Sequence, residues 1–244
     1  MRRLALPALL CAAALAAGCA APGRPPLTAA PEVGPNFDVP DARSRMIYLA
    51  RQEWTLFGRP VVIENGTEDP ALAFDDGGAT HEVQAPMLSR VLMYWYAVSR
   101  LPIVGYQGEL RPWSAAFISW LAKGAGLMPE EFPPTVLHWD YIERFLAAGG
   151  GERFVARDPA RYAPRAGDLV CNARAGNSAD FARLGRGPYH CDIVVEVHSG
   201  EVDAIGGNVG DVVALSRLPT DAQGLLAPHP RRPWAAVIEQ REGE

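Results

Sequence analysis

A serine at the start of an apolar helix is the residue whose type and position first indicate chemistry. Pro112 and Trp113 come directly before Ser114, and residues 115–121 are mostly apolar. Because proline is favoured in the first turn of a helix, this pattern predicts that Ser114 lies in the first turn of a buried helix. Unpaired backbone N–H groups and the positive end of the helix dipole favour an anion there, and a hydroxyl in such a place can act as a nucleophile. The alternative is that Ser114 only caps the helix.

A second candidate position lies on the next predicted helix. Thr135 is a typical cap for a helix that the sequence predicts as far as about Ala148. His138 then lies in the first turn, and Tyr141 follows one turn later on the same face. Together with Trp113, these two side chains are candidates for contacting a substrate beside the central helix. The alternative is that they are packing residues.

The N-terminus indicates export. Arg2 and Arg3 precede an apolar run over residues 4–17, which is followed by Gly18 and Cys19. This run is too short to span a membrane and has the order of a secretory signal. Its end resembles the lipobox of bacterial lipoproteins, and that resemblance implies that Cys19 is lipidated and becomes the first residue of the mature chain.

The same segment predicts the organisation of the rest. We expect a lipoprotein signal peptide (1–19), a Pro-rich tether (20–40) and a single domain (41–244). Ala20 gives no signal for retention in the inner membrane, so we expect an anchor in the outer membrane of the cell envelope that faces the periplasm. The lipobox pattern prefers leucine where Ala16 stands, and plain secretion after an Ala-x-Ala-like site is the alternative.

Composition sets further limits. The chain has 244 residues, 48% of them hydrophobic and 21% charged, which suffices for one sizeable core. A formal net charge of −5 provides no basic surface for nucleic acid. No Cys-x-x-Cys or His-x-x-x-His spacing indicates a metal site, and we expect no cofactor. In an oxidising compartment, Cys171 and Cys191 of the mature domain are expected to form a disulfide.

The order of the predicted elements favours an α+β fold. Helical periodicity and capping residues predict helices over about 41–57, 86–99, 112–124 and 135–148. Apolar runs between turn residues predict strands near 168–171, 190–197, 202–205, 211–215 and 234–240. Helices followed by such strands indicate N-terminal helices packed on an antiparallel β-meander.

Three motifs, followed by a glycine-rich turn, resemble a known superfamily. They are Trp113-Ser114-Ala115-Ala116-Phe117-Ile118-Ser119-Trp120, Pro164-Arg165-Ala166-Gly167-Asp168-Leu169-Val170 and His190-Cys191-Asp192-Ile193-Val194-Val195, with Gly206-Gly207-Asn208-Val209-Gly210 after them. In this order they are similar to the papain-like cell-wall hydrolases of the NlpC and CHAP type. They are also similar to a group of bacterial lipoproteins that carry a domain of unassigned function. The resemblance covers roughly residues 41–240 and implies a papain-like fold.

The resemblance also implies three catalytic roles. Ser114 takes the place of the nucleophile, His190 that of the base, and Asn208 that of the residue that orients the base. A neutral imidazole on a central strand could then accept a proton from the serine hydroxyl. Asp192 shares a strand face with His190 and is an alternative orienting group. Cys171 is an alternative nucleophile if its thiol is free.

One departure from the superfamily affects the function. Its nucleophile is cysteine, whereas this chain has serine. A thiol ionises readily at a helix N-terminus, but a hydroxyl must lose its proton as it attacks. We therefore expect either a peptidoglycan amide hydrolase (a peptidase or amidase) that uses serine, or an inactive module that binds cell-wall peptides. The expected partners are peptidoglycan and, through the lipid anchor, the membrane; we expect a monomer.

Overall fold

The computed structural model describes residues 40–63, 71–74, 87–148 and 152–241. The predicted signal peptide, its Cys19 and the tether up to residue 39 lie outside the described residues. In the part of the chain that the structure describes, no helix has the length and apolar character needed to cross a membrane.

Among the described residues, four α-helices form close to where the sequence predicts them. They are α1 (Ala42–Leu56), α2 (Met87–Val98), α3 (Ser114–Gly124) and α4 (His138–Leu146). Helix α1 begins where the Asp41 carboxylate accepts the backbone N–H of Ser44 at 2.9 Å, which is a standard N-cap. Helix α4 begins three residues later than predicted. The Thr135 hydroxyl accepts the N–H of Leu137 in the preceding turn and donates to Asp140 at 2.5 Å.

The strands form one eight-stranded sheet among the described residues. They are β1 (Val61–Ile63), β2 (Ala71–Ala73), β3 (Phe154–Arg157), β4 (Leu169–Ala173), β5 (Tyr189–His198), β6 (Glu201–Val209), β7 (Val212–Pro219) and β8 (Trp234–Gln240), with a short 3₁₀ helix η1 (Phe181–Arg183). The strand order is β2-β1-β7-β6-β5-β4-β8-β3. The α+β class is confirmed. The sheet is mixed, however, because β1 pairs in parallel with β7 beside the antiparallel β5-β6-β7 meander.

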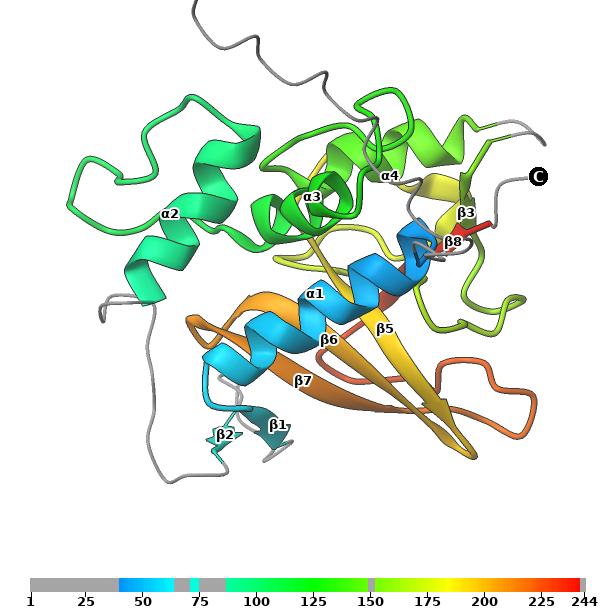
Figure 1. The fold of residues 1–244 in the computed structure, drawn as a ribbon. Helices are drawn as coiled ribbons and strands as arrows, with labels where there is room; N and C mark the ends of the chain where they lie inside the picture. The colour runs from blue at the N-terminus through cyan, green and yellow to red at the C-terminus, as the bar shows by residue number, and fades with distance from the viewer. Residues whose placement is uncertain (1–39, 64–70, 75–86, 149–151, 242–244) are drawn as a thin grey trace, which may run out of the picture. The chain divides into compact units, whose positions relative to one another are not determined.

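The helices and the sheet form two layers around the main core. Helix α1 lies across β5, β6 and β7, α3 contacts β5 and β6, and α4 contacts β3, β5 and β8 (Figure 1). Helix α2 packs on α3. A smaller apolar cluster that includes Val170, Val194 and Leu218 forms a second core, with Tyr162 and Trp234 packed against it. This arrangement places the beginning of α3 over the middle of the sheet.

Candidate active site

Ser114 is the first residue of α3, as the sequence predicts, and its side chain is largely buried. Trp113 occupies the N-cap position but makes no capping hydrogen bond with its side chain, so the first turn leaves backbone N–H groups without intrahelical acceptors. The Trp113 ring is fully buried and packs against Phe57 and Tyr94. The prediction that Trp113 contacts a substrate is therefore replaced by a role in packing the core.

Close approach of β6 fixes the position of this helix start. A Cβ atom added at Gly207 would lie 2.7 Å from Phe117 Cβ and 2.7 Å from Trp113 Cζ3. No side chain fits between strand and helix at this point, because real Cβ contacts are longer. The glycine therefore lets the first turn of α3 rest directly on the sheet.

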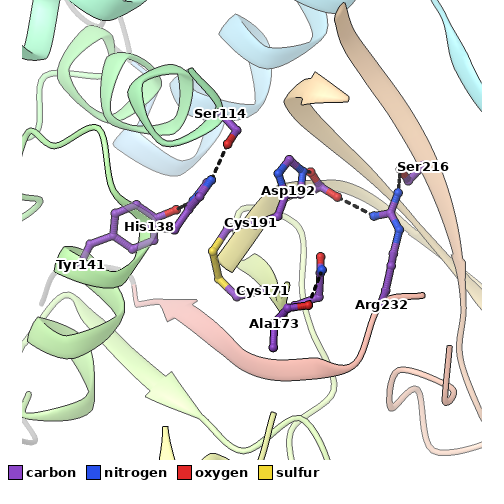
Figure 2. Close-up of polar contacts among 11 residues, drawn as sticks. Ser114, His138, Tyr141, Cys171, Ala173, Cys191, Asp192, Ser216 and Arg232 are labelled. Carbon is purple, nitrogen blue, oxygen red and sulfur yellow. Dashed lines mark hydrogen bonds and ion pairs between the residues drawn. A yellow bond between two sulfur atoms is a disulfide. The ribbon is translucent and has the colours of Figure 1, made fainter. Parts of the chain in front are cut away.

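The Ser114 hydroxyl is hydrogen-bonded to a histidine of the neighbouring helix. Its Oγ lies 2.7 Å from His138 Nε2, and His138 Nδ1 bonds to the Tyr141 hydroxyl (Figure 2). His138 and Tyr141 lie three residues apart on α4, as neighbours on one helix face. In the tautomer with a proton on Nδ1, the Nδ1–H donates to the Tyr141 oxygen and Nε2 accepts from Ser114. That is the arrangement a general base requires.

Burial determines the protonation states of His138 and Tyr141. Burial, aided by the nearby His190, holds the pKa of His138 well below its ordinary value, so the imidazole is neutral at pH 7. Burial likewise raises the pKa of Tyr141 well above its ordinary value. The phenol stays protonated and can orient the imidazole but not ionise it. A neutral imidazole can accept a proton, although a low pKa makes it a weaker base.

A second polar chain begins at His190, on β5. His190 Nε2 lies 2.7 Å from Asp192 Oδ1, and Asp192 Oδ2 accepts from Arg232 at 2.8 Å. The Arg232 guanidinium also donates to the Ser216 hydroxyl at 2.7 Å (Figure 2). All four side chains are buried. A buried carboxylate is tolerated here because it is paired with a cation and with a ring nitrogen.

The charges of these four hydrogen-bonded side chains balance. Burial alone would raise the pKa of Asp192, but His190 and Arg232 outweigh it and hold the pKa of the carboxyl well below its usual range. Burial lowers the pKa of His190, and the Asp192 carboxylate opposes that change. The resulting state at pH 7 is an Asp192–Arg232 ion pair beside a neutral His190.

The two imidazoles lie next to each other. The ring centroids of His138 and His190 are 5.5 Å apart, in an edge-to-face arrangement. Gly206 on β6 makes room for the second pair, since a Cβ atom there would lie 1.8 Å from Asp192 Oδ1 and 3.0 Å from His190 Nε2. The structure thus brings Ser114, His138, Tyr141, His190 and Asp192 into one buried cluster.

Asn208 does not share in these bonds. It lies within a register shift of the β6–β7 pairing, between Gly206 and Val209, and has a left-handed backbone with a φ of 59°, a conformation that asparagine tolerates better than most residues. Among the described residues, no hydrogen bond joins Asn208 to His190. The carboxylate of Asp192, the alternative orienting group, occupies His190 Nε2 instead.

Cys171 and Cys191 form a disulfide between β4 and β5. Their Cα atoms are direct cross-strand partners, with Asn172 and His190 as the next pair. A cysteine in a disulfide carries no thiol, so the alternative in which Cys171 acts as the nucleophile does not apply to this state of the protein.

Two residues that extend the cluster through hydrogen bonds were missed by sequence reasoning. Arg232 lies 40 positions after Asp192 in a loop that leads into β8, and Ser216 lies on β7. Neither residue has a motif around it, and only the folded sheet brings them to the carboxylate. The role of His138 was also underestimated, because its position on α4 gave no sign of a direct bond to Ser114.

A group with the geometry of metal ligands lies elsewhere. Glu196, His198 and Asp203 on the β5–β6 hairpin place ligand atoms within 4.8 Å of one another. Glu196 is paired with Arg51 at 2.7 Å, and Asp203 lies 3.4 Å from His198 Nε2. Ion pairing therefore accounts for this group.

Fold and site together define an α+β protein with a serine–histidine pair at a helix N-terminus. Residues 94–240 match the family described as "Uncharacterized protein conserved in bacteria (DUF2272)". The chain belongs to this family, whose matched region includes α3, α4 and strands β3 to β8. No curated protein and no solved structure matched the chain.

Proposed function

We propose that this protein is a cell-envelope lipoprotein that hydrolyses amide bonds of peptidoglycan peptides, with Ser114 as the nucleophile. The observation that carries the proposal is the 2.7 Å contact between Ser114 Oγ and His138 Nε2 at the first turn of α3. The envelope location rests on the signal-like N-terminus that ends in Cys19. The substrate class rests on the motif resemblance, and we expect the protein to act as a monomer.

We give the base role to His138 in place of His190, because His138 Nε2 is the ring nitrogen that contacts Ser114 Oγ. As Ser114 Oγ bonds to the substrate carbonyl carbon, its proton passes to His138 Nε2, while the backbone N–H groups of the first turn face the oxyanion. The proton then moves to the leaving amine nitrogen as the C–N bond breaks. A water molecule repeats the sequence and releases the acid product from the serine.

His190 and Asp192 support this step from the side. The Asp192 carboxylate lies beyond His190 and favours the protonated form of His138, so it can stabilise the positive charge that develops on His138 when it gains the proton. Tyr141 keeps the His138 ring in the tautomer that exposes Nε2 to the serine. The orienting role that the motifs imply for Asn208 stays a prediction.

An activity-based label tests the nucleophile directly. A fluorophosphonate reacts with serines that have a neighbouring base, and mass spectrometry should find it on Ser114. Ser114→Ala should abolish labelling, and His138→Gln should slow it roughly 100-fold or more, which is the usual size of general-base catalysis. Ser119→Ala is the matched control on the same helix, because the Ser119 hydroxyl bonds to the backbone of Thr135 and not to His138. Absence of labelling in the intact protein would count against an active serine.

Digestion of purified sacculi tests the substrate. The intact protein should release muropeptides with new amine and carboxyl ends, and Ser114→Ala should reduce the rate by roughly a thousandfold or more. Labelling of Ser114 without release of muropeptides would retain the hydrolase and exclude peptidoglycan. Cys19→Ser tests the anchor separately, since it should move the protein from the membrane fraction to the soluble fraction.

One observation favours a second candidate, a module that binds cell-wall peptides without cleaving them. Ser114 is only 8% exposed and His138 only 6%, so a substrate carbonyl must enter through a rearrangement of the helices. A binding module would retain affinity for muropeptides in Ser114→Ala and would not label with fluorophosphonate.

A further inference from the structure

A cavity separate from the serine–histidine cluster is lined by arginines. It has a volume of about 500 Å³ and lies where the start of α1, the loop after α3 and the ends of β3 and β8 meet. Arg43, Arg45, Arg153 and Arg241 line it together with Asp41 and Glu131. We call it the arginine cavity. Four positive and two negative side chains give its lining a formal charge of +2 (4 − 2).

The arginine cavity and Ser114 lie at opposite ends of α3. Ser114 is the first residue of this helix, and the cavity residues Gly126 and Leu127 follow its last residue, Gly124. The helix has 11 residues, and at about 1.5 Å each they separate the two places by about 16 Å along the helix axis. The two regions share no residue, so a ligand of one does not occupy the other.

Gln240 is the residue that indicates a ligand. It is the last residue of β8, lines the arginine cavity and is only 1% exposed. Its backbone is fully used, since the N–H donates to Asp168 at 2.9 Å and the carbonyl accepts from Arg43. Its side-chain amide is not: within the described part of the chain, neither Nε2 nor Oε1 has a hydrogen-bond partner. A buried amide that lacks both partners is costly and rare in folded proteins.

The neighbouring charges are held in place. Arg45 donates from Nε to the carbonyl oxygen of Ala125 at 2.7 Å and from a terminal nitrogen to that of Pro40. These acceptors fix the guanidinium but carry no formal charge. Arg153 is paired with Glu131 at 2.8 Å, and Arg241 is paired with Glu239 at 3.3 Å. A preorganised positive field next to an unsatisfied amide is what an anionic ligand would need for tight binding.

We propose that the arginine cavity binds a short acidic peptide. A peptide unit offers a carbonyl to Gln240 Nε2 and an N–H to Gln240 Oε1, which satisfies both halves of the amide at once. Side-chain carboxylates complement the arginine-rich lining, and arginine is the residue best suited to hold carboxylates. This inference does not depend on the activity of Ser114.

Calorimetry with matched peptides tests the proposal. N-acetyl-Glu-Glu amide should bind the full chain saturably, more weakly as salt is raised, and at least tenfold more tightly than the neutral N-acetyl-Gln-Gln amide. Gln240→Met and Arg45→Gln should each weaken binding at least tenfold. Arg100→Gln, which makes the same charge change at an exposed position outside the cavity, should leave affinity unchanged.

Thermal unfolding without ligand distinguishes a binding role from a structural one. If the amide of Gln240 serves a ligand, Gln240→Met should melt at the same temperature as the unmodified protein or higher, because it removes an unsatisfied buried group. A clearly lower melting temperature would overturn the assignment. Arg45→Gln keeps the test valid if Gln240→Met does not fold.

Two further measurements define what would contradict the proposal. Equal binding of the neutral peptide, or no binding of the acidic one, would exclude the site. Inorganic phosphate that binds as tightly as the acidic peptide would show a simple anion site in place of a peptide site. Each measurement should be repeated with Glu242→Gln and Glu244→Gln, which neutralise the two glutamates that follow Arg241 in the sequence and leave the chain end unchanged.

Discussion

The two histidines of the cluster show how their surroundings assign different roles to one residue type. His138 lies between two hydroxyl groups with one nitrogen directed at Ser114, and burial lowers its pKa so that the ring carries no formal charge. His190 is placed against a carboxylate that an arginine already neutralises. The first is suited to exchange a proton and the second to maintain the field around it.

Among the residues of the buried cluster, we predict that substitution of Asp192 lowers the free energy of unfolding most. Asp192→Asn removes the partner of Arg232, whose guanidinium is buried and would be left without its counter-charge. Breaking such a pair from one side typically costs about 3–5 kcal/mol. Urea denaturation should show this loss. Glu196→Gln, which breaks the solvent-exposed pair with Arg51, should leave the denaturation midpoint nearly unchanged.

Gly206 is predicted to tolerate no side chain. Gly206→Ala would place a methyl group 1.8 Å from Asp192 Oδ1, so the buried ion pair or β6 must move. We expect a loss of roughly 2–3 kcal/mol, toward the upper end of overpacking costs. Gly185→Ala is the control, because a methyl group added there would meet no atom within 4 Å. Equal denaturation midpoints for the two variants would contradict the close approach of β6 to the ion pair.

At the residue scale the sequence pointed to the side chains that form the buried cluster but not to the bonds between them. Ser114, His138, Tyr141, His190 and Asp192 were all recognisable as candidates from helix position, strand alternation and motif. Which imidazole faces the serine was not, because that depends on how α4 packs against α3. The contact between Arg232 and Asp192 could not be predicted from residue spacing, since the two residues are 40 positions apart in the sequence.

At the scale of the secondary-structure elements, the disulfide that joins strands β4 and β5 makes a testable contribution to stability. The disulfide between Cys171 and Cys191 closes a loop with a sequence separation of 20. By loop entropy this should contribute about 3 kcal/mol. Replacing both cysteines by alanine should lower the free energy of unfolding by that amount, as measured in urea. Iodoacetamide should not modify either cysteine before reduction, and modification of the unreduced protein would show that the pair is open.

Elements differed in how well the sequence predicted them. The helices have strong periodicity and clear stops, so their ends were placed to within about three residues. Strands β1, β2 and β3 have three or four residues each, too few for an alternating pattern to be recognised. These three strands also make the sheet wider than the predicted meander. The parallel pairing of β1 with β7 depends on the position of the end of α1, because β1 follows that helix in the sequence.

At the scale of the whole molecule, buried titratable groups predict how stability changes with pH. The folded pKa values of His138 and His190 are lowered, mainly by burial. Below about pH 6.5 the unfolded chain therefore binds protons that the folded chain does not, and stability falls as pH falls. Asp168 acts in the opposite sense, because burial raises its pKa to about 6. Between about pH 4 and 6 the folded state holds its proton more tightly, so this contribution is lost as pH rises.

Single variants should separate these two contributions. His138→Asn should flatten the fall in unfolding free energy between about pH 6.5 and 5, by up to about 1.4 kcal/mol per pH unit. Asp168→Asn should make the same fall steeper, because the opposing group is gone. Urea titrations at half-unit pH steps provide the measurement. Slopes that stay the same in both variants would show that other groups control acid unfolding.

The disulfide also has a consequence for how anything could reach the buried serine. Cys171 and Cys191 tie β4 to β5 one residue pair away from His190, so this end of the sheet cannot part without breaking a covalent bond. Helix α4, by contrast, is attached to its surroundings by noncovalent contacts alone among the residues described here. We therefore expect access to Ser114 to require a transient displacement of α4, while the sheet stays in place. Amide exchange would then be faster along His138–Leu146 than along β5.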